Sequence, residues 1–381
     1  MRPITEEKFE LVLKFLEEKK IDVLMIDDYE DNRNVNLQYL SGHPTDATLL
    51  ISSSGESFLI PWDVNLAEKH SEVDEIINPA NFRYNLFLAM QDLFENRWKK
   101  SSFTVGVHPM TSYGFIVKMQ ALIHEVEYFK EPMEIRQLLE KLRATKSDFE
   151  IAKLLKAAQI GTKTIEDVQD FCLNVPDGTE KDLSFLVRKK MAVYGADDVS
   201  FEPLVANSSR AHEIHQYPYA SDQKFNLPGL ALIDFGANFQ GYCSDITVPI
   251  SFGKLSDAHI KMREVIIEAY EAAIEMIDID VPLWKVHDTA EQILRIRGYQ
   301  MPYSLGHGLG LSVHDSPLIS RKPTDEYSKK YWKEETFQDG MVFTIEPGVM
   351  KQGLGGQRLE NDIAIRNGKV EIITKSRPLS F

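Results

Sequence analysis

The segment DFGANFQGYCSD, residues 234–245, begins and ends with an aspartate and has turn-forming residues between them. It follows the apolar run LPGLALI, so we expect a β-hairpin with its centre near Phe239 and Gln240. In such a hairpin Asp234 and Asp245 are equidistant from the turn and face each other. Like charges opposed across two strands are destabilising, and apolar surroundings strengthen the repulsion. Either one carboxyl group takes up a proton or a cation lies between the two.

A second region repeats this arrangement. Glu346 lies in the β-like run MVFTIEPGVM and Glu360 in RLENDIAI, with Gly353 midway between them. These glutamates can therefore face each other across another hairpin. The chain has 58 acidic residues, so a single pair can arise by accident, and a strand aspartate often protects a sheet edge. Two pairs in otherwise apolar strands favour a cation site.

Histidines complete the set of candidate ligands. The segment SLGHGLGLSVHDSP contains His307 and His314, and the glycines flanking His307 allow the backbone to approach closely. A lone histidine is more often a core or surface residue. In the order Asp, Asp, His, Glu, Glu, however, the residues predict an oxygen-rich site with one imidazole, which suits Mn, Co, Fe or Zn. Four carboxylates nearly balance two divalent cations, which together generate a nucleophile at neutral pH and polarise a carbonyl.

The elements that position these residues change in character along the chain. The first third alternates amphipathic helices with short strands such as IDVLMI and SFTVGVH, which predicts a small α/β domain with a central sheet. Ser147 and Glu150 form a predicted capping box, so a new helix should begin there. We place the domain boundary just before it, giving domains 1–143 and 144–381. One continuous helix without a boundary is the alternative.

After residue 200 short β-like runs dominate, and two helices interrupt them near residues 258–277 and 284–298. Strand runs with segregated helices are typical of an α+β domain on an antiparallel sheet. The fold class predicted for the whole chain is therefore α+β.

Composition excludes several classes of protein. A formal net charge of -15 over 381 residues argues against a nucleic-acid partner, because phosphate binding needs clustered Lys and Arg. The N-terminal segment is interrupted by charges, so no signal peptide is expected, and no apolar run is long enough to predict a membrane span. The two cysteines, Cys172 and Cys243, exclude a disulfide scaffold and favour a reducing, cytoplasmic location.

The motifs resemble the metallopeptidase family with the pita-bread fold, which includes methionine aminopeptidase, aminopeptidase P and prolidase. The matching stretches are IDFGANFQGYCSDIT, GHGLGLSVHDSP, FTIEPGVM and RLENDIAI. The N-terminal third is similar to the creatinase-type domain of prolidases and aminopeptidase P, through NLQYLSGH and ATLLISSSGESFLIPWD. The resemblance implies a creatinase-like domain followed by a catalytic domain on a curved antiparallel sheet. Methionine aminopeptidases usually lack the first domain.

The resemblance also implies a role for each residue. Asp234, Asp245, His307, Glu346 and Glu360 correspond to the ligands of two metal ions, with Asp245 and Glu360 bridging them. Glu346 would also take a proton from the bridging water and pass it on.

Three further residues have expected roles around the ligands. His314 and His215 correspond to histidines that face the substrate. Arg358 corresponds to a residue that orients a ligand, although a solvated strand arginine is the alternative reading of its position.

Four positions near the pocket depart from the pattern of the family. They do not remove a metal ligand, so they put the substrate preference in question rather than the metal chemistry. The departures are Val248 after the DxT element, Asp315 after His314, Ile214 before His215 and Met350 after EPG.

The function predicted from the resemblance is hydrolysis of the bond before proline at the N-terminus of dipeptides or short peptides. Two divalent metal ions are expected as cofactors, with Mn preferred over Co, Zn or Fe. A homodimer is expected from the two-domain members. A metal-dependent lyase or hydrolase of a small non-peptide substrate, and a non-catalytic binding protein on the same fold, are the alternatives. Retention of all five ligands argues against a binding protein.

Overall fold

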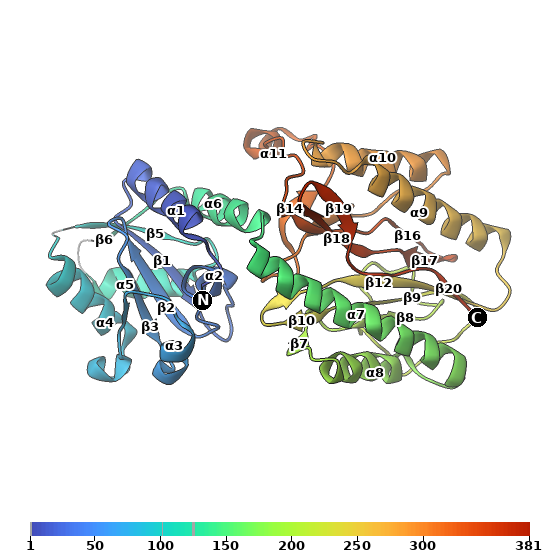
Figure 1. Cartoon of the computed structure of the whole chain (residues 1–381), viewed down its shortest axis with the longest axis horizontal. Helices are drawn as coiled ribbons and strands as arrows, with labels where there is room; N and C mark the ends of the chain where they lie inside the picture. The colour runs from blue at the N-terminus through green and yellow to red at the C-terminus, as the bar shows by residue number, and fades with distance from the viewer. Residues whose placement is uncertain (1, 101, 124–125) are drawn as a thin grey trace. The chain divides into compact units, whose positions relative to one another are not determined.

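The computed structural model describes residues 2–100, 102–123 and 126–381. The chain divides into two compact units, residues 1–142 and 143–381, shown in Figure 1. The boundary predicted from the sequence lies one residue later. We describe each unit separately.

The first unit is built on a mixed six-stranded sheet with the order β4-β3-β2-β1-β5-β6. Strands β1, β2 and β3 form an antiparallel meander, whereas β5 and β6 run parallel to β1. The predicted α/β domain with a central sheet is therefore present. Its helices are α1 (Glu6–Lys19), α2 (Val35–Ser41), α3 (Val64–His70), η1 (Pro79–Phe82), α4 (Leu86–Asp92), the π-helical segment η2 (Leu93–Trp98), α5 (Tyr113–Leu122) and α6 (Pro132–Ala144). Its strands are β1 (Val23–Asp28), β2 (Ala47–Ser52), β3 (Ser57–Pro61), β4 (Glu75–Ile76), β5 (Phe103–Val107) and β6 (Val126–Tyr128).

The second unit contains antiparallel ladders covered by helices. Its helices are α7 (Asp148–Asn174), α8 (Glu180–Val193), α9 (Asp257–Met276), α10 (Leu283–Ile296) and α11 (Glu326–Tyr331). Its first strands are β7 (Asp198–Val199), β8 (Leu204–Ala206), β9 (Gly229–Phe235), β10 (Ala237–Phe239), β11 (Tyr242–Cys243) and β12 (Ile246–Phe252). The remaining strands are β13 (Gly306–Gly308), β14 (Asp315–Ile319), β15 (Val342–Ile345), β16 (Gly348–Lys351), β17 (Gly355–Arg358), β18 (Asn361–Arg366), β19 (Lys369–Ile372) and β20 (Leu379–Ser380).

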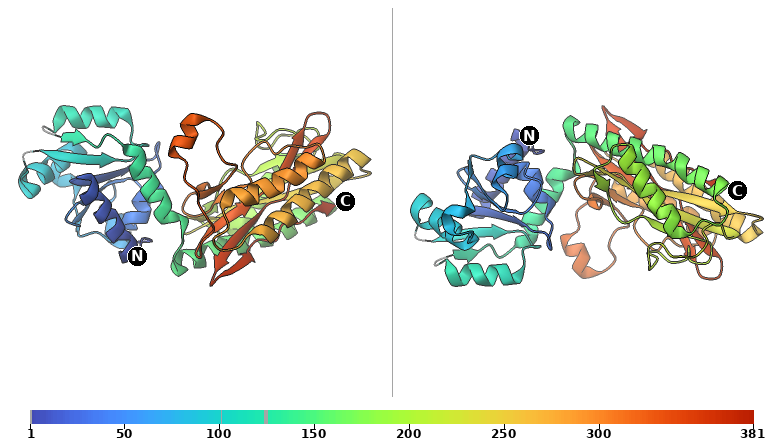
Figure 2. Two further views of the ribbon diagram at one scale, coloured as in Figure 1. Left: turned by 90° about the horizontal axis from the view of Figure 1, so that it is seen from above. Right: turned by 90° about the horizontal axis from the view of Figure 1, so that it is seen from below.

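Two pairs of helices cover the strands from opposite sides, as the two views in Figure 2 show. Side chains of α7 and α8 share one core cluster with β9 and β12, and this cluster includes Val168, Val187, Ile233 and Val248. Side chains of α9 and α10 share a second cluster with β15 and β18. Each half of the sheet system is thus buried by its own helix pair. This is the predicted pita-bread arrangement of a curved, mostly antiparallel sheet.

The predicted capping box at the start of α7 is present. The side chain of Ser147 accepts from the Glu150 backbone N–H, and the Glu150 carboxylate accepts in return from the Ser147 backbone at 2.9 Å. Helix α6 ends at Ala144, so the alternative of one continuous helix is wrong.

The first hairpin has a different register from the predicted one. Gln240 and Gly241 both have positive φ, 51° and 87°, which is the backbone of a tight two-residue turn. The turn therefore lies between these two residues, later than expected, and the pairing shifts by two. Asp234 lies opposite Thr247 rather than opposite Asp245. Because side chains alternate along a strand, the two aspartates still share one side of the ladder, as diagonal neighbours.

The second hairpin has the predicted register. Ile345 pairs with Asn361 on one side of the glutamates, and Gly348 pairs with Arg358 on the other. Glu346 and Glu360 therefore occupy facing positions between the two ladders.

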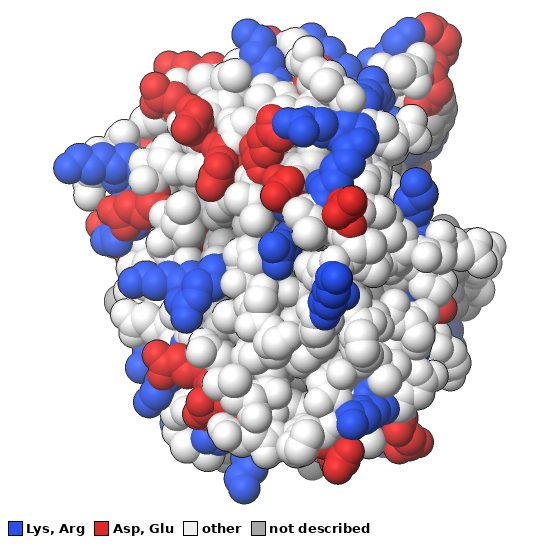
Figure 3. All heavy atoms as spheres, turned by 90° about the vertical axis from the view of Figure 1, so that its right-hand side faces the viewer, with Lys and Arg blue, Asp and Glu red and all other residues white. Residues whose placement is uncertain are grey.

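Both cysteines are free and buried. Among the described residues, no helix is long and apolar enough to cross a membrane. On the face shown in Figure 3, acidic and basic side chains are interspersed.

A glycine allows the two strands that carry the aspartates to approach each other. A Cβ on Gly236 would lie 1.8 Å from the carbonyl oxygen of Ser244, the residue before Asp245. Gly236→Ala should therefore displace that backbone and cost about 1–3 kcal/mol of unfolding free energy, as overpacking generally does. Urea unfolding measures this loss, and metal titration should show weaker binding because Asp245 moves with Ser244.

Gly114→Ala is the control for this substitution, because no heavy atom lies within 4 Å of a Cβ there. Its effect should stay within about 0.5 kcal/mol. A Gly236→Ala protein as stable as the wild type would show that the strands separate without cost.

Candidate metal centre

All eight residues singled out in the sequence line one pocket of about 230 Å³. Different strands, or the segments next to them, supply these residues, so no short stretch of chain builds the site alone. Asp234 is in β9, Asp245 directly precedes β12, His307 is in β13, His314 directly precedes β14, Glu346 directly follows β15, Arg358 ends β17, Glu360 lies between β17 and β18, and His215 is in the loop before β9.

The candidate ligand atoms are close enough to share metal ions. One group within 4.8 Å consists of Asp234, Asp245 and Glu360, and a second of His307, Glu346 and Glu360. Glu360 belongs to both groups, so its carboxylate lies near the ligand atoms of each. The Nε2 atom of His307 lies 3.6 Å from Asp245 Oδ2 and 3.5 Å from Glu346 Oε1.

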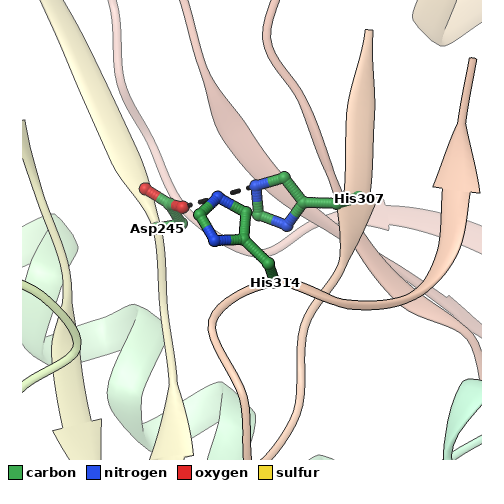
Figure 4. Close-up of side chains that lie close together, drawn as sticks. All are labelled: Asp245, His307 and His314. Atoms are coloured by element: carbon green, nitrogen blue, oxygen red, sulfur yellow. Dashed lines mark ion pairs between the residues drawn. The ribbon is translucent and has the colours of Figure 1, made fainter. Parts of the chain in front are cut away.

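Figure 4 shows a third group, in which His307 and His314 both point toward Asp245. The two imidazole rings lie 4.3 Å apart at 62°. Position alone therefore permits His314 to bind either a metal ion or a substrate held beside one.

The protonation state of His307 suits a metal ligand. Its Nδ1 lies 3.1 Å from the carbonyl oxygen of Gly308, which can only accept, so the ring proton is on Nδ1. Burial, together with nearby His314, lowers the pKa of His307 to about 4, so the ring is neutral at pH 7. The lone pair of Nε2 consequently faces the carboxylates.

The buried carboxylates repel one another strongly. Burial first, and then the charges of Glu360 and Asp234, raise the pKa of Asp245 well above its usual value. Burial also raises the pKa of Glu346 well above its usual value, with Glu360 adding to the effect. Burial raises the pKa of Glu360 to about 7. This arrangement is unfavourable without a counter-charge.

Two buried carboxylate oxygens of the site have no hydrogen-bond donor among the described residues. They are the Oδ1 atoms of Asp234 and Asp245. Buried acceptors of this kind are costly unless paired. Carboxylate oxygens with one imidazole fit Mn²⁺, Co²⁺ or Zn²⁺. The donor set therefore fits a pair of divalent ions.

Arg358 orients the acidic side chains from within the pocket wall. Its guanidinium pairs with Asp234 Oδ2, and its Nε donates to Thr247 Oγ1 at 2.7 Å. Thr247 in turn donates to Glu360 Oε2 at 2.5 Å. The arginine is only 5% exposed, so the alternative reading as a solvated strand residue is wrong. These bonds fix one oxygen each of Asp234 and Glu360 and leave the others facing the pocket.

A fifth buried carboxylate, Asp362, supports the site from behind. Both of its oxygens accept from the backbone N–H of Asp245, at 3.2 and 3.3 Å. Asp362 is 1% exposed and is positioned by pairing of β15 with β18, opposite Thr344. It holds the chain at Asp245 without lining the pocket.

Several residues of the site were not predicted from the sequence. Thr247 carried a usable signal, because it lies two residues after Asp245 on the same side of the strand. Glu202 and Tyr219 carried none, since their place in the pocket depends on loop conformation. The missed residues that line or support the pocket are Phe201, Glu202, Leu204, Tyr219, Thr247 and Asp362.

Removing one carboxylate should have opposite effects on stability and on metal binding. Asp245→Asn relieves repulsion in the metal-free protein and should raise its unfolding free energy by about 1 kcal/mol. The same change should weaken metal binding by at least about 100-fold, because a ligand is lost. Calorimetric titration and urea unfolding after chelation measure the two effects.

The matched control for this variant is Asp167→Asn. The carboxylate of Asp167 is outside the pocket and is bound by Lys190 at 2.5 Å and Tyr194 at 2.7 Å. That variant should lose stability and retain metal affinity. Equal metal affinity of Asp245→Asn and wild type would refute the assigned role of Asp245.

The stability of the metal-free protein should depend on pH through Glu360. Its pKa lies near 7 in the folded protein and at 4.5 ordinarily, so between these values the folded state binds more protons than the unfolded state. Stability from this group is therefore lost as pH rises from about 4.5 to about 7. Metal affinity should rise over the same interval, because ions displace these protons.

Thermal unfolding of chelated protein across this pH range, compared with Glu360→Gln, isolates the contribution of Glu360. The wild type should lose stability relative to the variant as pH rises. If the stabilities of the wild type and of Glu360→Gln changed with pH in parallel, Glu360 would not be the source of this pH dependence.

Comparison with known proteins places this geometry in a family. Residues 152–367 match the metallopeptidase family M24, and residues 9–145 match the creatinase/prolidase N-terminal domain. A Xaa-Pro dipeptidase of Pyrococcus horikoshii is 27% identical over 380 residues, covering 99% of both chains. An uncharacterized peptidase of Staphylococcus saprophyticus is 29% identical over 349 residues, covering 89% of this chain and 92% of that protein.

Solved structures show the same fold. The prolidase from Pyrococcus horikoshii has a TM-score of 0.81 at 25% identity, with 98% of this chain and 99% of that chain covered. The Xaa-Pro dipeptidase from Bacillus anthracis has a TM-score of 0.81 at 26% identity, with the same coverage. Since the first family match spans more than half of the sequence, the chain belongs to metallopeptidase family M24 and carries a creatinase-type domain before its catalytic domain.

Proposed function

We propose that this protein is a dinuclear-metal peptidase that hydrolyses the Xaa-Pro bond at the N-terminus of dipeptides or short peptides. The observation that carries the proposal is the convergence of four buried carboxylates and one neutral imidazole on a single small pocket. The names of the relatives, Xaa-Pro dipeptidase and prolidase, supply the substrate class.

Five residues would hold the ions: Asp234, Asp245, His307, Glu346 and Glu360. Asp245 and Glu360 would bridge, because Glu360 belongs to two ligand groups and Asp245 lies near both Asp234 and His307. When bound, two divalent cations lower the pKa of a water molecule held between them and polarise the scissile carbonyl. Mn²⁺ is the first candidate, with Co²⁺, Zn²⁺ and Fe²⁺ as the others.

Glu346 is the proposed proton carrier. Its backbone N–H donates to Leu305 O at 2.8 Å, and its Oε2 lies 3.9 Å from Arg358 Nε, so the carboxylate is held in place. A carboxylate beside the attacking water can take its proton and deliver it to the leaving nitrogen. The proline nitrogen leaves as a secondary amine and needs this proton, as any amide nitrogen does when its bond to the carbonyl carbon breaks.

His314 and His215 would act on the substrate rather than on the ions. Burial lowers the pKa of His314, which keeps the ring neutral, and its contact with His307 places it beside the carboxylates. A neutral imidazole donates one hydrogen bond to the oxygen that gains negative charge during attack. His215 lies at the exposed side of the same pocket and would contact the remainder of the peptide.

The substrate class is tested with purified protein, Mn²⁺ and two sets of peptides. Xaa-Pro dipeptides and longer Xaa-Pro peptides should be cleaved before proline, and matched peptides with alanine in place of proline should be cleaved more slowly. The ratio of kcat/KM between dipeptides and longer peptides distinguishes a dipeptidase from an aminopeptidase. If the metal-loaded protein cleaves neither set, the proposal fails.

The role of His314 is tested separately. His314→Gln should lower kcat by about 100-fold, the usual effect of removing a donor to a developing oxyanion. Metal affinity should remain that of the wild type. A large fall in affinity, measured by calorimetry, would instead make His314 a metal ligand.

The predicted homodimer remains a prediction, which sedimentation analysis of the whole chain would decide.

A further inference from the structure

The loop of residues 207–228, between β8 and β9, carries His215 and Tyr219 to the pocket. Loops longer than about 15 residues that contain no helix or strand are uncommon unless they serve a function. The middle of this loop is exposed, and Ile214, Tyr217 and Tyr219 are 36%, 90% and 47% exposed. Something outside this middle segment must therefore hold it in place.

One buried carboxylate connects the two arms of the loop. Glu180, at the start of α8, is 0% exposed. Its Oε1 accepts from the backbone N–H of Asn207 at 2.8 Å, in the first arm. Its Oε2 accepts from the backbone N–H of Ser221 at 2.8 Å and from the Ser221 hydroxyl at 2.5 Å, in the second arm.

Arg210 completes this connection. Its guanidinium pairs with Glu180 Oε2, and its Nη2 donates to the carbonyl oxygen of Pro218. Arg210 is 8% exposed. A buried charge pair with its hydrogen bonds satisfied is costly to break from one side only, because the remaining charge is left unpaired. The segment between Arg210 and Pro218, which contains His215, is thus closed at its base.

Backbone contacts place the closed loop on the pocket. The N–H of Val205, in β8, donates to Tyr219 O at 2.8 Å, and the N–H of Lys181 donates to Ser221 O at 3.1 Å. None of these contacts involves a candidate metal ligand. The loop is therefore fixed by α8 and by β8, and β8 in turn pairs with β9, which carries Asp234.

We infer that Glu180 and Arg210 are positioning residues, which fix His215 and Tyr219 against the metal pocket and so set the affinity for the peptide. This inference rests on the proposed peptidase function. This loop offers the imidazole of His215 and the aromatic ring of Tyr219 to the pocket, which suits a peptide backbone followed by a proline ring.

Two variants test the inference. Arg210→Met leaves Glu180 with its three remaining donors and should fold, whereas Glu180→Gln leaves Arg210 without its anionic partner. Both should raise KM for an Xaa-Pro peptide about tenfold, with kcat changed less than about threefold, because binding geometry is disturbed more than the chemistry. Metal affinity should stay at the wild-type value.

Asp167→Asn is the matched control, since it breaks a charge pair between α7 and α8 in the same unit. It should lower stability without changing KM. A merely structural role for Glu180 and Arg210 would give the same result as this control, and that outcome would overturn the inference. The inference would also be overturned if Arg210→Met lowered kcat and metal affinity by the same factor.

Hydrogen exchange separates this inference from the proposed function. Backbone amides of residues 211–217 and 219 should exchange faster in Arg210→Met than in wild type and Asp167→Asn, whether or not any peptide is cleaved. If wild type cleaves no Xaa-Pro peptide, the proposed function fails, and unchanged exchange in Arg210→Met would then overturn the positioning role too.

Discussion

The mutual repulsion of four buried carboxylates is the constraint on which the catalytic unit depends. Folding brings Asp234, Asp245, Glu346 and Glu360 around one pocket, although burial disfavours the charged form of each. Two paired hairpins, a close backbone contact at Gly236 and the pairing of Arg358 resist the tendency of these groups to separate. The protein thus stores an unfavourable arrangement that bound cations relieve.

The two helix pairs explain how that arrangement is held. One core, under α7 and α8, fixes the strands that carry the aspartates, and the other, under α9 and α10, fixes those that carry the glutamates. The site lies where the two cores meet, so small displacements of either change the distances between ligands. The loop fixed by Glu180 is bonded to α8 and to β8, the strand that pairs with β9 at Asp234.

Much of this could be predicted from the sequence, because the ligands lie in strands with strong alternation and turn signals. The Glu346–Glu360 register was right, since Gly353 marked the turn between them. The register of the aspartates was wrong, because the positive φ of Gln240 was not evident from residue type. Asp362 and Glu180 could not be found, since their partners come from distant segments and only the folded chain brings them together.

The separation of the ligands along the chain gives bound cations a second consequence. Strand β9 and strand β17 are distant in sequence, yet Asp234 and Arg358 are in contact, and the ions would join the same segments. Such ions act as a non-covalent cross-link that exists only in the folded protein, and their free energy of binding adds directly to its stability. The supply of trace metal would therefore set the heat tolerance of this enzyme as well as its rate.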